Sequence, residues 1–175
     1  RFGVETASLD LLNGGKKIIF DNAFSKGNQS IPINGLIWMG DKAFMQEQIK
    51  KKLGEGYSCL KLKIGSLDFN TELEILAAIR KVADPADLII RVDANGAFSP
   101  PAALSKLEQL SAFNLHSIEQ PIRAGQWEAM QVICLHSPVP IALDEELIGI
   151  SGKGQKETLL REINPAYIIL KPTLL

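Results

Sequence analysis

The sequence predicts an α/β fold in which about six strands form part of a β/α barrel. Short apolar runs alternate with helical segments through residues 31–175, which is typical of repeated strand–helix units. Five consecutive runs also end in a charged residue, 25 to 30 residues apart. Because parallel strands present their carboxyl ends at one rim, this spacing predicts a cluster of charges there. Six strands also suit an open doubly wound sheet, which is the alternative fold.

The first 30 residues predict a helix followed by a connector. Phe2–Leu12 has apolar side chains at mixed helical spacing, and Asn13–Gly15 is a strong helix stop signal. Lys16–Ser30 is polar and contains glycine, apart from the apolar run Ile18–Phe20. We therefore expect the tail of a helix, then a connector with one short strand at that run.

Six strands are expected after the connector, because each of six short apolar runs is bounded by turn residues. They are Ile33–Met39, Ser58–Ile64, Leu88–Gly96 with Asp93 near its end, Leu115–Glu119, Val139–Asp144 and Ala166–Lys171. The nearly continuous apolar run in the third of these favours a strand covered on both faces.

Five helices are expected between these strands. Asp41 is suited to cap the first helix, and Ser99 followed by Pro100 is suited to begin the third. The side chains expected to face inward are Phe44, Met45, Ile49 and Leu53, then Phe69, Leu73, Leu76, Ile79 and Val82, then Leu104, Leu107 and Leu110, then Trp127, Met130 and Ile133, and finally Leu159, Leu160 and Ile163.

Composition predicts a globular protein with a small-molecule partner. The 175 residues are 46% hydrophobic, and 19 Lys and Arg oppose 20 Asp and Glu for a formal charge of -1. This balance argues against nucleic acid and anionic membranes as partners. Cys59 and Cys134 lie in apolar segments without metal-type spacing, which predicts small core residues in a reducing compartment. Without a spanning segment or signal peptide, we expect a cytoplasmic protein.

Three acidic strand ends predict a metal site. Asp93, Glu119 and Asp144 would meet at the mouth of an apolar barrel, where their mutual repulsion and lost hydration require compensation. A divalent cation would supply it. Because all three ligands are hard oxygens, Mg²⁺ is favoured over zinc, with Mn²⁺ as the alternative. Independent helix caps would need the three acids to share a strand position by chance.

Two lysines on one strand predict a general base. Lys61 and Lys63 are two residues apart, so both side chains point to the same face of their strand. Their adjacent ammonium groups and a nearby metal are expected to lower the lysine pKa toward the range of a base. Lys171 would arrive from the opposite side of the ring. Taken alone, the Lys-x-Lys pattern also suits a solvated edge strand.

The charge balance of this site favours a small anionic carboxylate as substrate. Three lysines, three carboxylates and one divalent cation leave a net positive charge. A substrate carboxylate near the metal, with its α-proton directed at Lys63, fits this balance. The chemistry would be formation of a carbanion that is stabilised as an enediolate.

Taken together, these motifs resemble the muconate-lactonizing subgroup of the enolase superfamily, over residues 31–175. The motifs are Lys61-Leu62-Lys63, Asp93-Ala94-Asn95, Glu119-Gln120-Pro121, Asp144-Glu145 and Lys171-Pro172. Within the subgroup, three segments are most similar in sequence to the o-succinylbenzoate synthases of bacterial menaquinone biosynthesis. They are Ile33–Trp38, Arg91–Phe98 and Ile118–Ile122.

The resemblance implies a role for each residue of the site. Asp93, Glu119 and Asp144 would bind Mg²⁺, as carboxylates do generally in enolase-superfamily sites. Lys63 would remove the proton α to the carboxylate of 2-succinyl-6-hydroxy-2,4-cyclohexadiene-1-carboxylate and then assist departure of the hydroxyl as water. Lys171 would stabilise the enediolate, and Lys61 would tune the basicity of Lys63. Asn95, two residues after Asp93, is a candidate to orient a metal ligand without contacting the metal.

The resemblance also implies a domain division. Residues 1–30 would be the end of a capping region with its connector, and residues 31–175 a partial barrel that carries the catalytic groups. Because the chain starts at Arg1 rather than Met, we expect a fragment, with the rest of the capping domain and the last barrel strands outside it. Two alternative functions stay open: an N-acylamino acid racemase or dipeptide epimerase, and a noncatalytic metal-binding fragment. With any of these functions, the protein could form a homo-oligomer.

Overall fold

The computed structural model describes residues 1–174 and consists of six strands and six α-helices in that range. Leu175, the last residue of the second expected domain, lies outside the described residues. The predicted alternation of strands and helices is confirmed. The elements are α1 (Phe2–Leu12), β1 (Gly35–Ile37), α2 (Lys42–Gly54), β2 (Cys59–Lys63), α3 (Phe69–Arg80), β3 (Ile89–Asp93), α4 (Pro100–Ser111), β4 (Ser117–Glu119), α5 (Trp127–His136), β5 (Ile141–Leu143), the 3-10 turn η1 (Glu145–Leu147), α6 (Lys153–Ile163) and β6 (Tyr167–Ile168).

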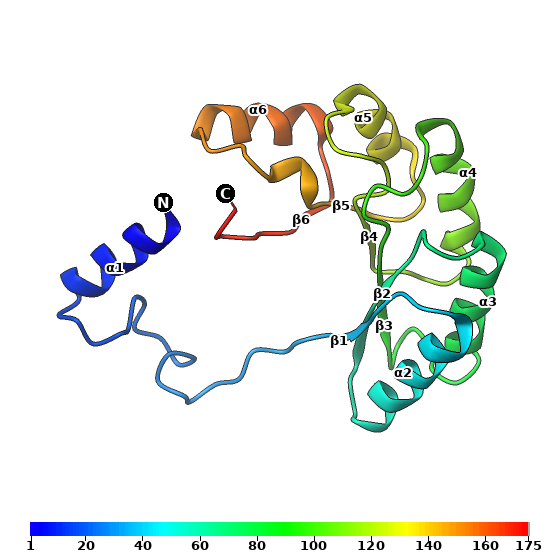
Figure 1. Ribbon diagram of the computed structural model, residues 1–175, viewed down its shortest axis with the longest axis horizontal. Helices are drawn as coiled ribbons and strands as arrows, with labels where there is room; N and C mark the ends of the chain where they lie inside the picture. The colour runs from blue at the N-terminus through cyan, green and yellow to red at the C-terminus, as the bar shows by residue number, and fades with distance from the viewer. Residues whose placement is uncertain (175) are drawn as a thin grey trace.

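All six strands are parallel, and their spatial order is the same as their order in the sequence. A doubly wound sheet reverses its strand order at one point, so this topology excludes the alternative fold. The sheet curves, and helices α2 to α5 lie along its outer side (Figure 1). The inner side is therefore concave, as in an arc of a β/α barrel.

The hydrophobic core lies between the outer side of the sheet and the helices. In β2, Leu60 and Leu62 are at most 1% exposed and alternate with half-buried lysines. Leu76 of α3 and Leu107 of α4 are fully buried in the same cluster. Burying one such side chain contributes about 1.5–3 kcal/mol, so this layer supplies much of the stability of the fold.

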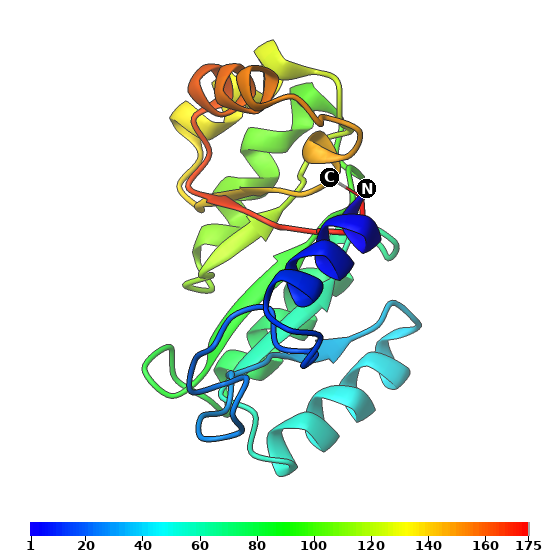
Figure 2. The same cartoon turned by 90° about the vertical axis from the view of Figure 1, so that its left-hand side faces the viewer.

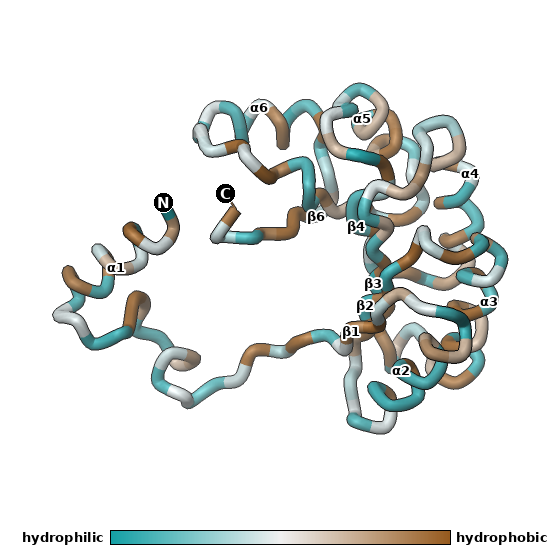
Figure 3. Tube along the Cα trace, viewed as in Figure 1, coloured by the Kyte–Doolittle hydropathy of each residue, from teal (hydrophilic) through white to brown (hydrophobic). Residues whose placement is uncertain are grey.

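Helix α1 differs from the other helices because none of its residues is buried. It lies apart from the outer helices, with several hydrophobic segments along it (Figure 3). The start of α1 and the segment that follows β6 lie near each other in both ribbon views (Figures 1 and 2). The Arg1 guanidinium donates to the carbonyl of Ser151 across 3.3 Å.

No helix within residues 1–174 combines the length and apolar character needed to cross a membrane.

The strand expected at Ile18–Phe20 is absent, so that prediction is wrong. The side-chain amide of Asn13 donates to the carbonyls of Ile18 and Ile19 at 3.2 and 2.8 Å. These carbonyls therefore bond to the end of α1 instead of a neighbouring strand.

All six strands are shorter than predicted. In β1, pairing ends before Trp38, because the Gln48 side chain bonds both the N–H and the carbonyl of Trp38 at 3.0 and 3.1 Å. Ile33 and Met39, which lie outside β1, are exposed. Strand β6 has two residues only.

Three predicted burials are also wrong. Phe44 is 49% exposed, because it lies in the first turn of α2 against Gly40 at the rim. Val82 is 73% exposed, because α3 ends at Arg80 and leaves Val82 beyond the helix. Ile89 is 46% exposed on the concave side, so β3 is not covered on both faces. Asp41 caps α2 as expected, whereas the Ser99 side chain makes no capping hydrogen bond.

Candidate active site

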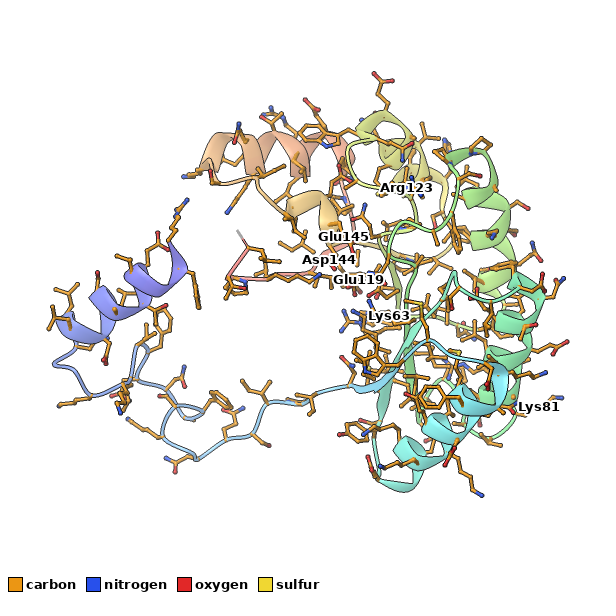
Figure 4. All side chains as sticks on the ribbon, in the orientation of Figure 1. Lys63, Lys81, Glu119, Arg123, Asp144 and Glu145 are labelled. Carbon is orange, nitrogen blue, oxygen red and sulfur yellow. The ribbon has the colours of Figure 1, made fainter. Side chains whose placement is uncertain are left out.

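The charged strand ends lie side by side on the concave face. Lys63 of β2 is in register with Asp93 of β3, which is in register with Glu119 of β4. Asp144 directly follows β5, two residues beyond the register partner of Glu119. Figure 4 shows Lys63, Glu119 and Asp144 together on the inner side of the sheet, with Lys81 on the outer side. The parallel register therefore brings the predicted groups to one rim.

The three carboxylates are buried and each is paired with a lysine. Asp93, Glu119 and Asp144 are at most 2% exposed. The ammonium of Lys61 lies 2.7 Å from Glu119 Oε2 and 3.0 Å from Asp93 Oδ2, and that of Lys63 lies 2.7 Å from the same Asp93 oxygen. Lys171 donates to Asp144 Oδ2. These pairs offset the cost of burying three negative charges.

The lysine pairing sets the direction of each pKa. Burial by itself lowers the pKa of Lys61, but its bonds to Glu119 and Asp93 outweigh burial, so the pKa is raised. The pKa of Lys171 is raised for the same reason by Asp144.

The two carboxylates that share Lys61 shift in opposite directions. Burial raises the pKa of Asp93, but two ammonium groups outweigh burial, and the pKa is lowered. Burial also raises the pKa of Glu119, and the negative charges of Asp93 and Asp144 raise it further. The ion pair with Lys61 lowers it, but by less. Glu119 therefore keeps a raised pKa despite its ion pair.

Asn95 connects the lysine and carboxylate groups. Its backbone adopts a left-handed conformation with φ +43°, and its N–H donates to Asp93 Oδ1 at 3.0 Å. Its side-chain oxygen accepts from Lys63 at 2.7 Å, while its amide nitrogen donates to Glu145 at 2.9 Å. Glu145 is the acid next to Asp144 in the sequence, and the sequence analysis gave it no role. Its adjacency to a predicted ligand was the available signal.

A buried acid fixes the loop that follows Lys63. One oxygen of Glu72 accepts three successive backbone N–H groups, from Gly65 at 2.6 Å and from Ser66 and Leu67 at 3.2 Å each. Gly65 has φ +94°, and a Cβ there would come within 2.4 Å of Ala97 Cβ. Glycine is therefore required where this loop meets the loop after β3. Glu72 lies on α3 and not at a strand end, so its position in the sequence gave no signal of this role.

The donor chemistry of the site suits a hard divalent cation. Asp144 Oδ1 and Glu145 Oε2 are buried without a hydrogen-bond partner among the described residues, and carboxylate oxygens are the preferred ligands of Mg²⁺. Within residues 1–174, no three His, Cys, Asp or Glu side chains are close enough together to hold a metal as they stand. Lysine ammonium groups lie between the acids instead.

The two cysteines lie outside this site and are half-buried instead of fully buried. Burial raises the pKa of Cys134 to about 11 and raises that of Cys59 as well. Burial therefore disfavours the thiolate form of both side chains.

Comparisons with known proteins agree with this geometry. A profile of the family described as enolase C-terminal domain-like matches residues 44–154. An o-succinylbenzoate synthase from Desulfotalea psychrophila is 59% identical over the whole chain, which covers 47% of that protein. The chain thus spans less than half the length of this relative.

Solved structures show the same fold. The crystal structure of MenC from Desulfotalea psychrophila superposes on 95% of this chain and 46% of its own, with a TM-score of 0.86 and 59% identity. An o-succinylbenzoate synthase from Thermosynechococcus elongatus, solved with Mg in its active site, matches 83% of this chain and 45% of its own, with a TM-score of 0.71 and 24% identity.

Proposed function

Because this chain belongs to the enolase C-terminal domain-like family, we propose that it carries the catalytic groups of an o-succinylbenzoate synthase. The reaction is the dehydration of 2-succinyl-6-hydroxy-2,4-cyclohexadiene-1-carboxylate to o-succinylbenzoate, a step in menaquinone biosynthesis. The 59% identity with the enzyme of that name supports the substrate. The observation that carries the chemistry is the lateral register of Lys63, Asp93 and Glu119 at the carboxyl ends of three adjacent strands.

Asp93, Glu119 and Asp144 would hold Mg²⁺, and Mn²⁺ would be able to replace it. When bound, the cation supplies positive charge against the negative charge that develops on the substrate carboxylate. The unpartnered Asp144 oxygen supports this assignment, as does the Mg in the active site of the relative from Thermosynechococcus elongatus.

Lys63 acts as the base. It accepts the proton from the carbon α to the substrate carboxylate, and the electron pair left behind forms a new ring double bond as the carbon–oxygen bond to the β-hydroxyl breaks. The resulting Lys63 ammonium returns the proton to the departing hydroxyl, which leaves as water. The ring becomes aromatic, and no oxidant or reductant is needed.

The other two lysines act through their charge. Lys171 keeps its ammonium beside Asp144 and opposes negative charge on the substrate. Lys61 holds Asp93 and Glu119 together, at 3.0 and 2.7 Å, and so fixes the carboxylate that contacts Lys63. Asn95 contacts Lys63 directly and holds its Nζ in position.

The proposed domain division follows from these roles. Residues 1–30 form the end of a capping region and its connector, and residues 31–175 form the barrel part that carries the lysines and carboxylates. The exposed apolar side chains of α1 support this division, because a helix that packs on its own barrel would bury some of them. We further propose that the protein acts in the cytoplasm.

A racemase or epimerase of the same superfamily is the second candidate. One observation favours it: Lys63 and Lys171 reach the site from β2 and from the segment after β6, which lie far apart in the sheet order. Two lysines on opposite sides of a substrate would be able to remove and return an α-proton on either face.

One experiment separates these two candidates. The full-length protein, supplied with Mg²⁺ in deuterated water, is incubated with the cyclohexadiene substrate and, separately, with N-succinyl amino acids. We expect an aromatic ultraviolet spectrum from the first and much slower deuterium exchange at the α-carbon of the second. Racemisation of the amino acid derivatives without dehydration would overturn the proposed function.

A further inference from the structure

The segment that follows Glu119 contains a fully buried glutamine with an unusual backbone conformation. Gln120 is 0% exposed and has φ +41°. Residues other than glycine and asparagine seldom adopt this left-handed backbone conformation. Its backbone still extends the sheet, because its N–H donates to Ala142 at 2.9 Å and its carbonyl accepts from Gly96 at 2.7 Å. A residue held in this way requires strong local interactions.

The Gln120 carboxamide makes all four hydrogen bonds available to it. Its oxygen accepts from the backbone N–H groups of Asp144 at 3.1 Å and Glu146 at 3.3 Å. Its nitrogen donates to the carbonyl of Ile122 at 3.0 Å and to Glu146 Oε2 at 3.1 Å. Only one orientation of the amide fits, because two partners are donors and two are acceptors.

Glu146 continues this connection to the loop after β4. It is 4% exposed, and its other oxygen accepts from the N–H of Gly125 at 2.8 Å. Gln120 and Glu146 therefore join the loop that follows Glu119 to the turn that carries Asp144. None of these hydrogen bonds reaches the carboxylates on the concave face, so both residues act on Glu119 and Asp144 through the backbone.

We propose that Gln120 and Glu146 form a clamp that sets the separation between Glu119 and Asp144, and thereby the metal affinity of the site. Gln120 is adjacent to one proposed ligand in the sequence and bonds the backbone of another. This makes it a positioning residue. The inference rests on the proposed function only in that Glu119 and Asp144 are taken as metal ligands.

The test compares substitutions that remove the hydrogen bonds of Gln120 or Glu146 with control substitutions that leave these bonds in place. Gln120→Met keeps the length of the side chain and removes all four hydrogen bonds. Gln126→Met is the matched control, because Gln126 lies in the same loop and donates to the carbonyl of Arg123 at 2.9 Å without reaching Asp144. Ile133→Ala controls for lost stability, because Ile133 is a core residue of α5 and is 2% exposed. Glu146→Gln is a milder second variant that removes one acceptor.

The affinity of each full-length variant for Mg²⁺ is measured by calorimetry, and its affinity for Mn²⁺ by electron paramagnetic resonance, beside thermal unfolding. Gln120→Met should weaken metal binding by about 10–100-fold, the usual effect of removing a group that orients a ligand. Glu146→Gln should weaken it by less, and if Gln120→Met does not fold, Glu146→Gln decides the outcome. Gln126→Met should bind as the wild type does. Ile133→Ala should lose thermal stability without losing affinity.

The outcomes separate the clamp from the enzyme assignment. Wild-type metal affinity in the folded Gln120→Met and Glu146→Gln proteins would overturn the clamp, as would an equal loss of affinity in Ile133→Ala. A wild-type protein that binds metal but does not dehydrate the cyclohexadiene would overturn the proposed function while the clamp stands on the affinities. A wild-type protein that binds neither cation would overturn both.

Discussion

The two faces of the sheet use the same strands for opposite purposes. In β2, Leu60 and Leu62 face the helices at 0% and 1% exposure, whereas Lys61 and Lys63 face the concave side. The outer face holds the fold together through burial, and the inner face collects charges that are buried only because they pair. Since successive residues of a strand alternate between faces, stability and chemistry are separated by one position in the sequence.

Lys63→Ala should produce the largest effect, because it removes the proposed base from the concave face. Dehydration should slow by about 10²–10⁴-fold, with the product followed by its ultraviolet absorbance. Lys81→Ala is the matched control, because Lys81 is exposed on the outer side (Figure 4). Dehydration at the wild-type rate by the Lys63 variant would show that the concave lysine is not the base.

Leu62→Ala tests the contribution of the outer face to stability, at the residue next to Lys63. It should lower the free energy of unfolding by about 2–5 kcal/mol, because it opens a cavity in the core. The rate per folded molecule should change little. Leu135→Ala, at a position 75% exposed on α5, should change stability by no more than about 0.5 kcal/mol. Urea unfolding measures both, and equal losses in the two variants would contradict the assignment of the core to this face.

Glu72→Gln should have the smallest effect and tests a buried charge that bonds backbone instead of lysine. Burial raises the pKa of Glu72 above its ordinary 4.5, and its bonds to three N–H groups oppose this only in part. The folded protein therefore holds this proton more tightly than the unfolded chain. Through this group, stability falls as pH rises from that ordinary value through the raised one.

The Gln side chain keeps an oxygen for the loop and does not ionise, so the variant should lack this decrease. Free energies of unfolding in urea from about pH 4 to about pH 8 provide the measurement. The stability of the variant relative to the wild type should increase with pH. A difference that is constant, or that changes in the opposite direction, would show that Glu72 does not carry a raised pKa.

Much of the fold was predictable because burial repeats along the chain with the period of each element. Asp41 identified the start of α2 through its capping side chain, as the bond to Phe44 N–H at 2.9 Å shows. The strand ends at Lys63, Asp93 and Glu119 were predictable because parallel register follows from repeated units. The prediction failed at Ile18–Phe20, where the Asn13 side chain bonds the carbonyls that a neighbouring strand would need.

The sequence by itself determined which residues would meet at the rim, because alternation along strands and regular strand–helix units depend on local order only. The tertiary structure alone decided how these charges are paired, and therefore that the pKa of Lys61 is raised. It also decided the roles of Glu72, Gln120 and Glu146, whose partners lie on other loops. Hydrogen bonds and ion pairs depend on distances that no spacing along the chain specifies.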